Sequence, residues 1–106
     1  MKDFEKLIEQ KRIKKKAYSD LEKYLVNYRK EEYEDYCELF YGICEDNVNY
    51  VLHSISYVLD EIRFEDKVYK YILVKIYLEH KDDYFAEYTV AYDLNVGYID
   101  DYLLKV

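Results

Sequence analysis

The spacing of the apolar residues changes partway along the chain, and this change restricts the possible folds more than any other feature. Between residues 3 and 43 apolar side chains recur every three or four positions, as on one face of a helix. From Lys67 onward they recur at every second position, as in strands with one buried face. The sequence therefore predicts helices first and a sheet afterwards.

The predicted helical segment, at about residues 3–43, has one weak point. Its apolar stripe stops over residues 11–16, which are basic on nearly every side. The residues that follow, Ser19-Asp20-Leu21-Glu22, have the form of a capping box, which is typical of a helix start. We therefore expect a break near residues 18–19, with one long helix as the alternative. Gly42 is placed to help end the helical segment.

Residues 47–62 fit two interpretations. The apolar positions Val48, Val51, Leu52, Ile55, Leu59 and Ile62 match a helix. The segment is also rich in β-branched and aromatic residues, which are typical of strands. We favour a helix here and keep a strand as the alternative.

Two turns divide the rest of the chain into three predicted strands. The turns are Lys81-Asp82-Asp83 and Asn95-Val96-Gly97, and the third strand covers Tyr98–Leu104. An antiparallel sheet with one apolar face needs a cover, which the helices can supply. We predict an α+β fold in a single domain, residues 1–106, with N-terminal helices packed on a C-terminal three- to four-stranded antiparallel sheet. The predicted buried face consists of Val68, Ile72, Val74, Ile76, Leu78, Tyr84, Ala86, Tyr88, Val90 and Tyr92.

Charge is distributed unevenly along the chain, whose formal net charge is −7. Residues 1–30 carry ten Lys or Arg and five Asp or Glu, whereas residues 31–106 carry six and eighteen. A chain with a basic first third and a strongly acidic remainder is expected to bind charged partners. The acidic part would be repelled by anionic lipid, so we expect no membrane partner.

The N-terminus and the cysteines indicate a cytoplasmic protein. The first residues are charged and lack the apolar run of a signal peptide, and no stretch approaches the roughly 20 apolar residues of a membrane span. Cys37 and Cys44 lie seven positions apart in a segment predicted to be helical, hence about 10 Å apart and too far for a disulfide. Free thiols are typical of the cytoplasm, which would be that of the host if a phage encodes the protein.

The sequence lacks the motifs of common enzyme classes. Its two glycines cannot form a phosphate-binding loop, and no nucleophile elbow, zinc-protease motif or calcium loop is present. The residues Cys37, Cys44, His53 and His80 lack the spacing of zinc ligands. We predict a protein that is not an enzyme, without a catalytic residue, metal, cofactor or small-molecule substrate.

A more specific pattern is the alternation of tyrosine with carboxylates. Tyrosine is favoured at binding hot spots, and spaced carboxylates resemble the charges of a phosphate backbone. A solvated sheet surface with the same composition is the structural alternative. The predicted partner-binding residues are Glu31, Glu32, Tyr33, Glu34, Asp35, Tyr36, Asp82, Asp83, Tyr84, Glu87, Tyr88, Tyr98, Asp100, Asp101 and Tyr102.

The basic segment admits three interpretations. It contacts phosphate, or it pairs with the acidic part of this chain or a second copy, or it is a solvated helix end. The phosphate-contact candidates are Lys11, Arg12, Lys14, Lys15 and Lys16.

These features favour a small acidic inhibitor that occupies a basic nucleic-acid-binding surface of a partner protein, such as a nuclease. A phage-encoded inhibitor of a host defence nuclease, of the anti-CRISPR kind, fits the size, the acidity and the abundance of residues with A/T-rich codons. One alternative is an immunity protein or antitoxin that neutralises a basic toxin. Another is a regulatory protein that binds nucleic acid through residues 11–16. A homodimer is compatible with the Tyr-rich strands.

Overall fold

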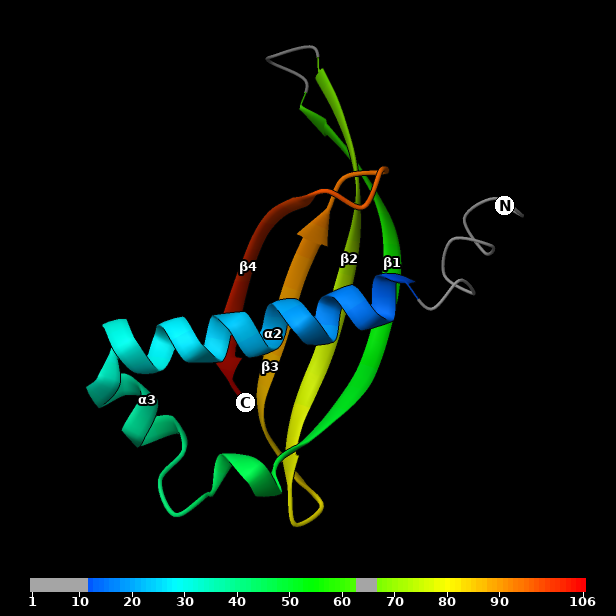
Figure 1. The fold of residues 1–106 in the computed structure, drawn as a ribbon. Coiled ribbons are helices and arrows are strands. Elements are labelled where there is room, and N and C mark those ends of the chain that lie inside the picture. Colours follow the sequence, from blue (N-terminus) through cyan, green and yellow to red (C-terminus); the bar gives the residue numbers. More distant parts are fainter. Residues whose placement is uncertain (1–11, 63–66) are drawn as a thin grey trace.

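The fold is a helix laid across a four-stranded antiparallel sheet. The computed structural model describes residues 12–62 and 67–106, and Figure 1 shows α2 crossing one face of the sheet. The strands follow one another in the order β1-β2-β3-β4, as a simple meander. The elements are α2 (Arg12–Glu31), α3 (Tyr33–Leu39), a short 3₁₀ helix η1 (Glu45–Asn47), β1 (Asn49–Ile62), β2 (Lys67–His80), β3 (Asp83–Tyr92) and β4 (Tyr98–Lys105). The predicted α+β architecture, with helices before the sheet, is confirmed.

Helix α2 is held against the sheet by an apolar residue in every turn. Its buried residues are Ile13, Ala17, Leu21 and Leu25, spaced four apart. This spacing keeps them on one side of a helix, where each buried leucine contributes roughly 1.5–3 kcal/mol. They pack on the buried residues of β2 and β3, which are Ile72, Val74, Ile76, Leu78, Ala86, Tyr88, Val90 and Tyr92.

The predicted helix break near residues 18–19 is wrong, because α2 runs unbroken from Arg12 to Glu31. Ile13 and Ala17 carry the apolar stripe through the basic run, so no interruption in packing requires a break. The chain turns at Glu32 instead, and α3 ends at Leu39, before the predicted boundary at residue 43. Gly42 adopts φ +72° in the turn after α3, a conformation that glycine tolerates. Residues 3–11 of the predicted helical segment lie outside the described residues.

The preference for a helix at residues 47–62 is also wrong, since β1 pairs with β2 from Asn49 to Ile62. A bulge between Leu52 and Ser54 explains the misleading pattern. It moves the residues that face α2 from even to odd numbers, so Leu52 and Ile55 share a face at a helix-like spacing of three. The bulge therefore gives this strand an apolar spacing that resembles the spacing in a helix.

A second irregularity redirects Tyr84. The register shifts between Leu78 and Glu79, so Tyr84 pairs with Glu79 rather than continuing the buried face. Its ring stacks on Tyr77 on the other face of the sheet, with the ring centroids 4.5 Å apart. Val68 is likewise exposed, because β1 and β2 project beyond the other strands (Figure 1).

Local turn chemistry joins the strands. Lys81 and Asp82 both have positive φ, as the tight β2–β3 hairpin turn requires. In the β3–β4 turn, Asp93 Oδ1 accepts hydrogen bonds from the backbone N–H groups of Asn95 and Gly97, both at 2.8 Å. A Cβ on Gly97 would lie 2.6 Å from the Asp93 carboxylate, so this turn needs glycine.

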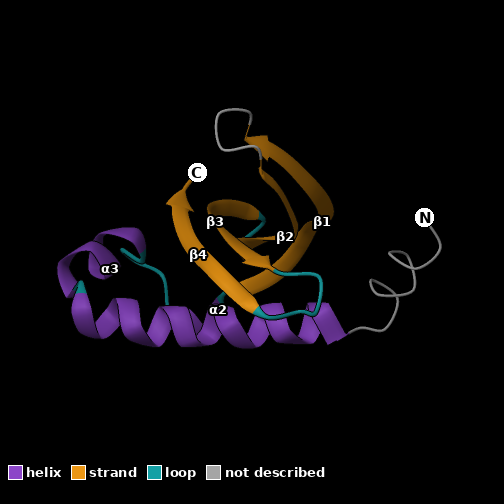
Figure 2. Cartoon of the chain, turned by 90° about the horizontal axis from the view of Figure 1, so that it is seen from above, coloured by secondary structure: helices purple, strands orange, loops and turns teal. Residues whose placement is uncertain are grey.

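The sheet has one covered and one open face. Figure 2 shows α2 along one side of the strands, and none of the described helices lies on the opposite side. Side chains on this open face include Tyr71, Leu73 and Thr89. Any site on this face is therefore formed by strands alone.

Candidate protein-binding surface

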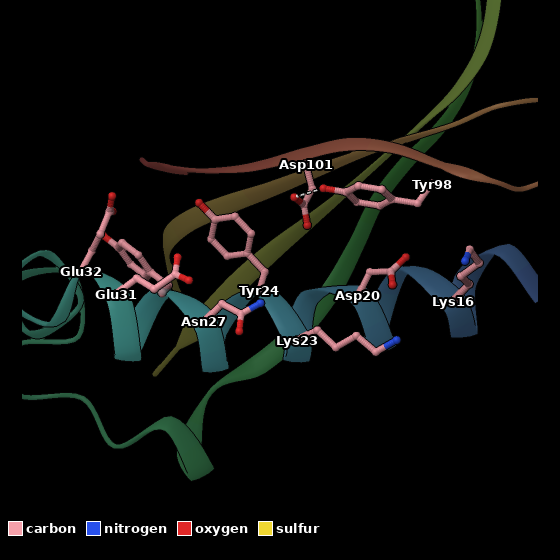
Figure 3. A pocket seen from close by; sticks show the side chains of 10 residues that line it. Lys16, Asp20, Lys23, Tyr24, Asn27, Glu31, Glu32, Tyr98 and Asp101 are labelled. Carbon is pink, nitrogen blue, oxygen red and sulfur yellow. Dashed lines mark hydrogen bonds between the residues drawn. The ribbon is translucent and has the colours of Figure 1, made fainter.

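A groove between α2 and β4 brings together predicted site residues that are far apart in sequence. Its volume is about 580 Å³, and Figure 3 shows side chains of α2 on one side with Tyr98 and Asp101 of β4 on the other. Five predicted residues line it, namely the phosphate-contact candidate Lys16 and the partner-binding candidates Glu31, Glu32, Tyr98 and Asp101. The sequence interpretation missed the other residues that line the groove. They belong to α2 but lie outside its buried stripe, and they are Asp20, Lys23, Tyr24, Asn27 and Tyr28.

Two of the four carboxylates that line this groove, Asp20 and Asp101, are occupied by internal hydrogen bonds. Asp101 accepts bonds from the hydroxyls of Tyr88 and Tyr98, each at 2.6 Å. Asp20 accepts one from Tyr92, also at 2.6 Å. Since Tyr88 and Tyr92 are fully buried, these bonds connect the core to the groove. Tyr88 is therefore a core residue, and its predicted place on a binding surface is wrong.

The same bonds change the ionisation of the tyrosines. Burial and the bond to Asp101 raise the pKa of Tyr88, and burial and the bond to Asp20 raise the pKa of Tyr92. The bond to Asp101, followed by partial burial, raises the pKa of Tyr98 to about 12. The hydroxyls thus remain protonated donors at neutral pH.

At one end of the groove, the α2–α3 junction and helix α3 carry a run of exposed carboxylates, two of which also line the groove. This acidic corner consists of Glu31, Glu32, Glu34, Asp35 and Glu38. Burial raises the pKa of Tyr28, and the charges of Asp35, Glu32 and Glu38 raise it further. Carboxylates of α3 and of the turn before it therefore act on a ring of α2. The ion pairs within the described part of the chain involve Glu87 and none of the acidic corner.

Exposed tyrosines flank the acidic corner. Tyr33 is 63% exposed and Tyr41 is 88% exposed. Tyr36, a third predicted residue, is half-buried; its hydroxyl donates to Glu45 and its ring stacks on Phe40 with centroids 4.6 Å apart. The corner thus combines free negative charge with two aromatic side chains available for contact.

The remaining predicted residues lie elsewhere. Asp82 and Asp83 are exposed at the β2–β3 turn. Glu87 lies on the open face, where its carboxylate is 3.7 Å from His53 and 3.9 Å from Lys75. Asp100 and Tyr102 also lie on the open face, paired in register with Ala91 and Thr89. The predicted residues therefore occupy several separate surfaces.

Two cations of the basic segment contact tyrosine rings. Lys14 Nζ lies 5.7 Å from the centre of the Tyr18 ring, and Lys16 Nζ lies 5.5 Å from that of Tyr92. Lys15 and Arg12 are exposed, and Lys11 lies outside the described residues. The contacts are cation–π contacts with tyrosine rings, and neither ion pair of the described residues involves this segment, so the predicted pairing with the acidic part of the chain stays a prediction.

The cysteines and histidines form no metal centre in the described ranges, where no group of three potential ligands comes together. Cys37 and Cys44 are free, exposed thiols. Cys44 lies beyond the end of α3, so the helical spacing assumed for this pair does not apply.

Comparison of the chain with protein-family models, with curated proteins and with solved structures yields no match. Function must therefore be argued from the residues themselves. Within residues 12–62 and 67–106, no helix has an apolar stretch long enough to cross a membrane.

Proposed function

We propose that the protein is a small acidic inhibitor whose acidic corner occupies a basic nucleic-acid-binding surface of a partner protein. The observation that carries this proposal is the set of five exposed carboxylates at the α2–α3 junction, none of them ion-paired with a described residue. The adjacent Tyr33 and Tyr41 supply contact area with little loss of side-chain entropy.

The repulsion among these carboxylates favours a surface that binds a basic partner over one that only faces solvent. Like charges held close together destabilise the folded chain through mutual repulsion. Internal cations could reduce that repulsion, but neither Arg29 nor Lys30, which precede the corner in sequence, forms an ion pair with it, and Arg29 lies 5.9 Å from the centre of the Tyr36 ring. A basic partner would neutralise the corner, and the charges would accelerate encounter at low ionic strength.

The identity of the partner follows from the chemistry of its surface. A protein groove that holds a nucleic-acid backbone presents arginine and lysine side chains to spaced negative charges. The acidic corner presents spaced negative charges on a folded scaffold, so it competes for such a groove. A defence nuclease inhibited by a phage-encoded protein is the biological setting that we propose.

A capture experiment with matched charge variants tests this function. The Glu31→Gln/Glu34→Gln variant and the control Glu22→Gln/Glu61→Gln remove the same charge, and all four positions are exposed. Wild type and control should capture the same nucleic-acid-binding protein from a bacterial lysate, with recovery falling as salt rises. The corner variant should bind that protein roughly tenfold more weakly.

Equal loss of binding in both variants would show that net charge alone matters, which contradicts a defined surface. The bait could instead capture nucleic acid and no protein. If the Lys14→Gln/Lys15→Gln variant then lost this nucleic acid, the result would contradict the inhibitor proposal and show that the basic start of α2 binds nucleic acid.

A further inference from the structure

The open face of the sheet contains a hollow that the groove and the acidic corner do not share. Its volume is about 440 Å³, and residues of all four strands line it. The floor and walls include Tyr69, Tyr71, Leu73, Thr89, Ala91 and Tyr102. We refer to it as the open-face hollow; its lining is largely aromatic and aliphatic, as in ligand sites generally.

Thr89 is the unusual residue of this hollow. Its side chain is 1% exposed, and its Oγ1 has no hydrogen-bond partner among the described residues. Leaving a buried hydroxyl unpaired destabilises a fold, whereas valine has nearly the same shape without that penalty. A threonine here is explained if a ligand supplies the missing hydrogen bond.

Two carboxylates stand beside the hollow on opposite edge strands. Asp60 of β1 accepts a hydrogen bond from Tyr71 at 2.7 Å, and Asp100 Oδ1 of β4 accepts one from the Asp101 backbone N–H at 2.9 Å. Neither carboxylate is ion-paired with a described residue. With Lys70 as the one cation in the lining, the hollow carries a net negative charge.

The tyrosines provide faces on which a cation can stack. Tyr69 and Tyr102 are 44% and 46% exposed, so their rings are accessible. The hydrogen bond to Asp60, followed by burial, raises the pKa of Tyr71, so its hydroxyl remains a donor to that carboxylate. Aromatic faces combined with carboxylates are the usual surroundings of a bound organic cation.

We infer that the open-face hollow binds an arginine side chain of the partner protein, with the guanidinium against the Tyr102 ring and near Asp100 and the Thr89 hydroxyl, which are neighbours in the β3–β4 register. Arginine fits better than lysine, because its planar guanidinium stacks on aromatic rings and carries five donors. The negative charge of the hollow disfavours a phosphate or a nucleic acid. The inference rests on the proposed function, since a nucleic-acid-binding groove is rich in arginine.

The test uses isolated arginine and needs no partner. N-acetyl-arginine methylamide is titrated into the ¹⁵N-labelled full chain, and the neutral citrulline compound of the same shape serves as control. The arginine probe should shift the backbone amides of Thr89, Ala91 and Tyr102 in a saturable manner. Absence of saturable shifts there, or equal binding of citrulline, would overturn the inference.

Two variants identify the groups that bind. Tyr102→Ala should weaken arginine binding roughly two- to fivefold, the magnitude expected for one exposed cation–π contact. Thr89→Val should weaken arginine binding while leaving the thermal midpoint unchanged or higher. A Thr89→Val variant that is less stable yet binds arginine normally would show that the hydroxyl is structural, and would contradict the assignment.

This result is separable from the proposed function. The Glu31→Gln/Glu34→Gln variant should bind the arginine probe as wild type does, because those residues do not line the hollow. If that variant also captures the same proteins as wild type, the acidic-corner function fails while the hollow remains an arginine site. If the Glu31→Gln/Glu34→Gln variant loses the partner, whereas Tyr102→Ala binds the arginine probe and captures the partner as wild type does, the arginine inference fails and the acidic-corner function stands.

Discussion

Individual tyrosines in this chain serve two different purposes that sequence cannot separate. Tyr88 and Tyr92 are buried, with their hydroxyls directed to Asp101 and Asp20. Tyr33 and Tyr41 are exposed beside carboxylates. Tyr33 and Tyr88 both occur in the alternation of tyrosine and acid, so the pattern predicted a binding surface for both, although only Tyr33 is exposed. Only the three-dimensional position shows which hydroxyls donate inward.

The inward-facing tyrosines predict a loss of stability in alkali. Their folded-state pKa values lie above the ordinary value of about 10, so their contribution is complete below about pH 10 and is lost as pH rises through the folded values. For Tyr98 the folded pKa is about 12. The free energy of unfolding in urea should therefore begin to fall near pH 10 and continue to fall up to about pH 12.

Tyr92→Phe is the control for this effect, because it removes one buried hydroxyl. Its stability should fall less steeply with pH than that of wild type. Absorbance at the phenolate band provides the second readout. If every tyrosine of the folded protein ionised near pH 10, the inward hydrogen bonds would not hold.

At the scale of elements, the α2 stripe and the β2 and β3 strands follow directly from apolar spacing. The errors arose where local geometry shifted that spacing. The bulge at Leu52–Ser54 made β1 resemble a helix, and Ala17 was too small and isolated within the basic run to be counted in the α2 stripe. Bulges depend on pairing with a neighbouring strand, and this information is absent from a single segment.

The stripe itself predicts an unequal response to two truncations in α2. Leu21→Ala removes a fully buried side chain and should lower the free energy of unfolding by about 2–5 kcal/mol. Val26→Ala, at a position 54% exposed, should change it by less than about 0.5 kcal/mol apart from helix propensity. Urea denaturation followed by circular dichroism measures both. Similar losses at the two positions would contradict the packing described for α2.

At the scale of the molecule, α2 connects an exposed basic end to the acidic corner, with Arg29 and Lys30 in its last turn. Its 20 residues extend about 30 Å, from exposed Arg12 and Lys15 to the acidic corner. This polarity was readable from the sequence as a basic first third and an acidic remainder. The division of the acidic residues among the corner, the β2–β3 turn and the open face was not, because it depends on the turn at Glu32 and on the register of β4.

The partner surface thus consists of two separate proposed sites, one electrostatic and one specific. The acidic corner supplies long-range attraction, and the open-face hollow supplies a site for a single arginine. They lie on different elements, so each can be altered while the other is kept.

Competition with nucleic acid is the most direct test of the central claim. The captured partner is bound to a labelled DNA or RNA that it recognises, and wild type, Glu31→Gln/Glu34→Gln and Glu22→Gln/Glu61→Gln are added in turn while anisotropy is recorded. Wild type and the Glu22/Glu61 control should displace the nucleic acid at similar concentrations, and the corner variant should need roughly tenfold more. A ternary complex in which the partner holds both nucleic acid and this protein, or equal displacement by all three forms, would contradict the account.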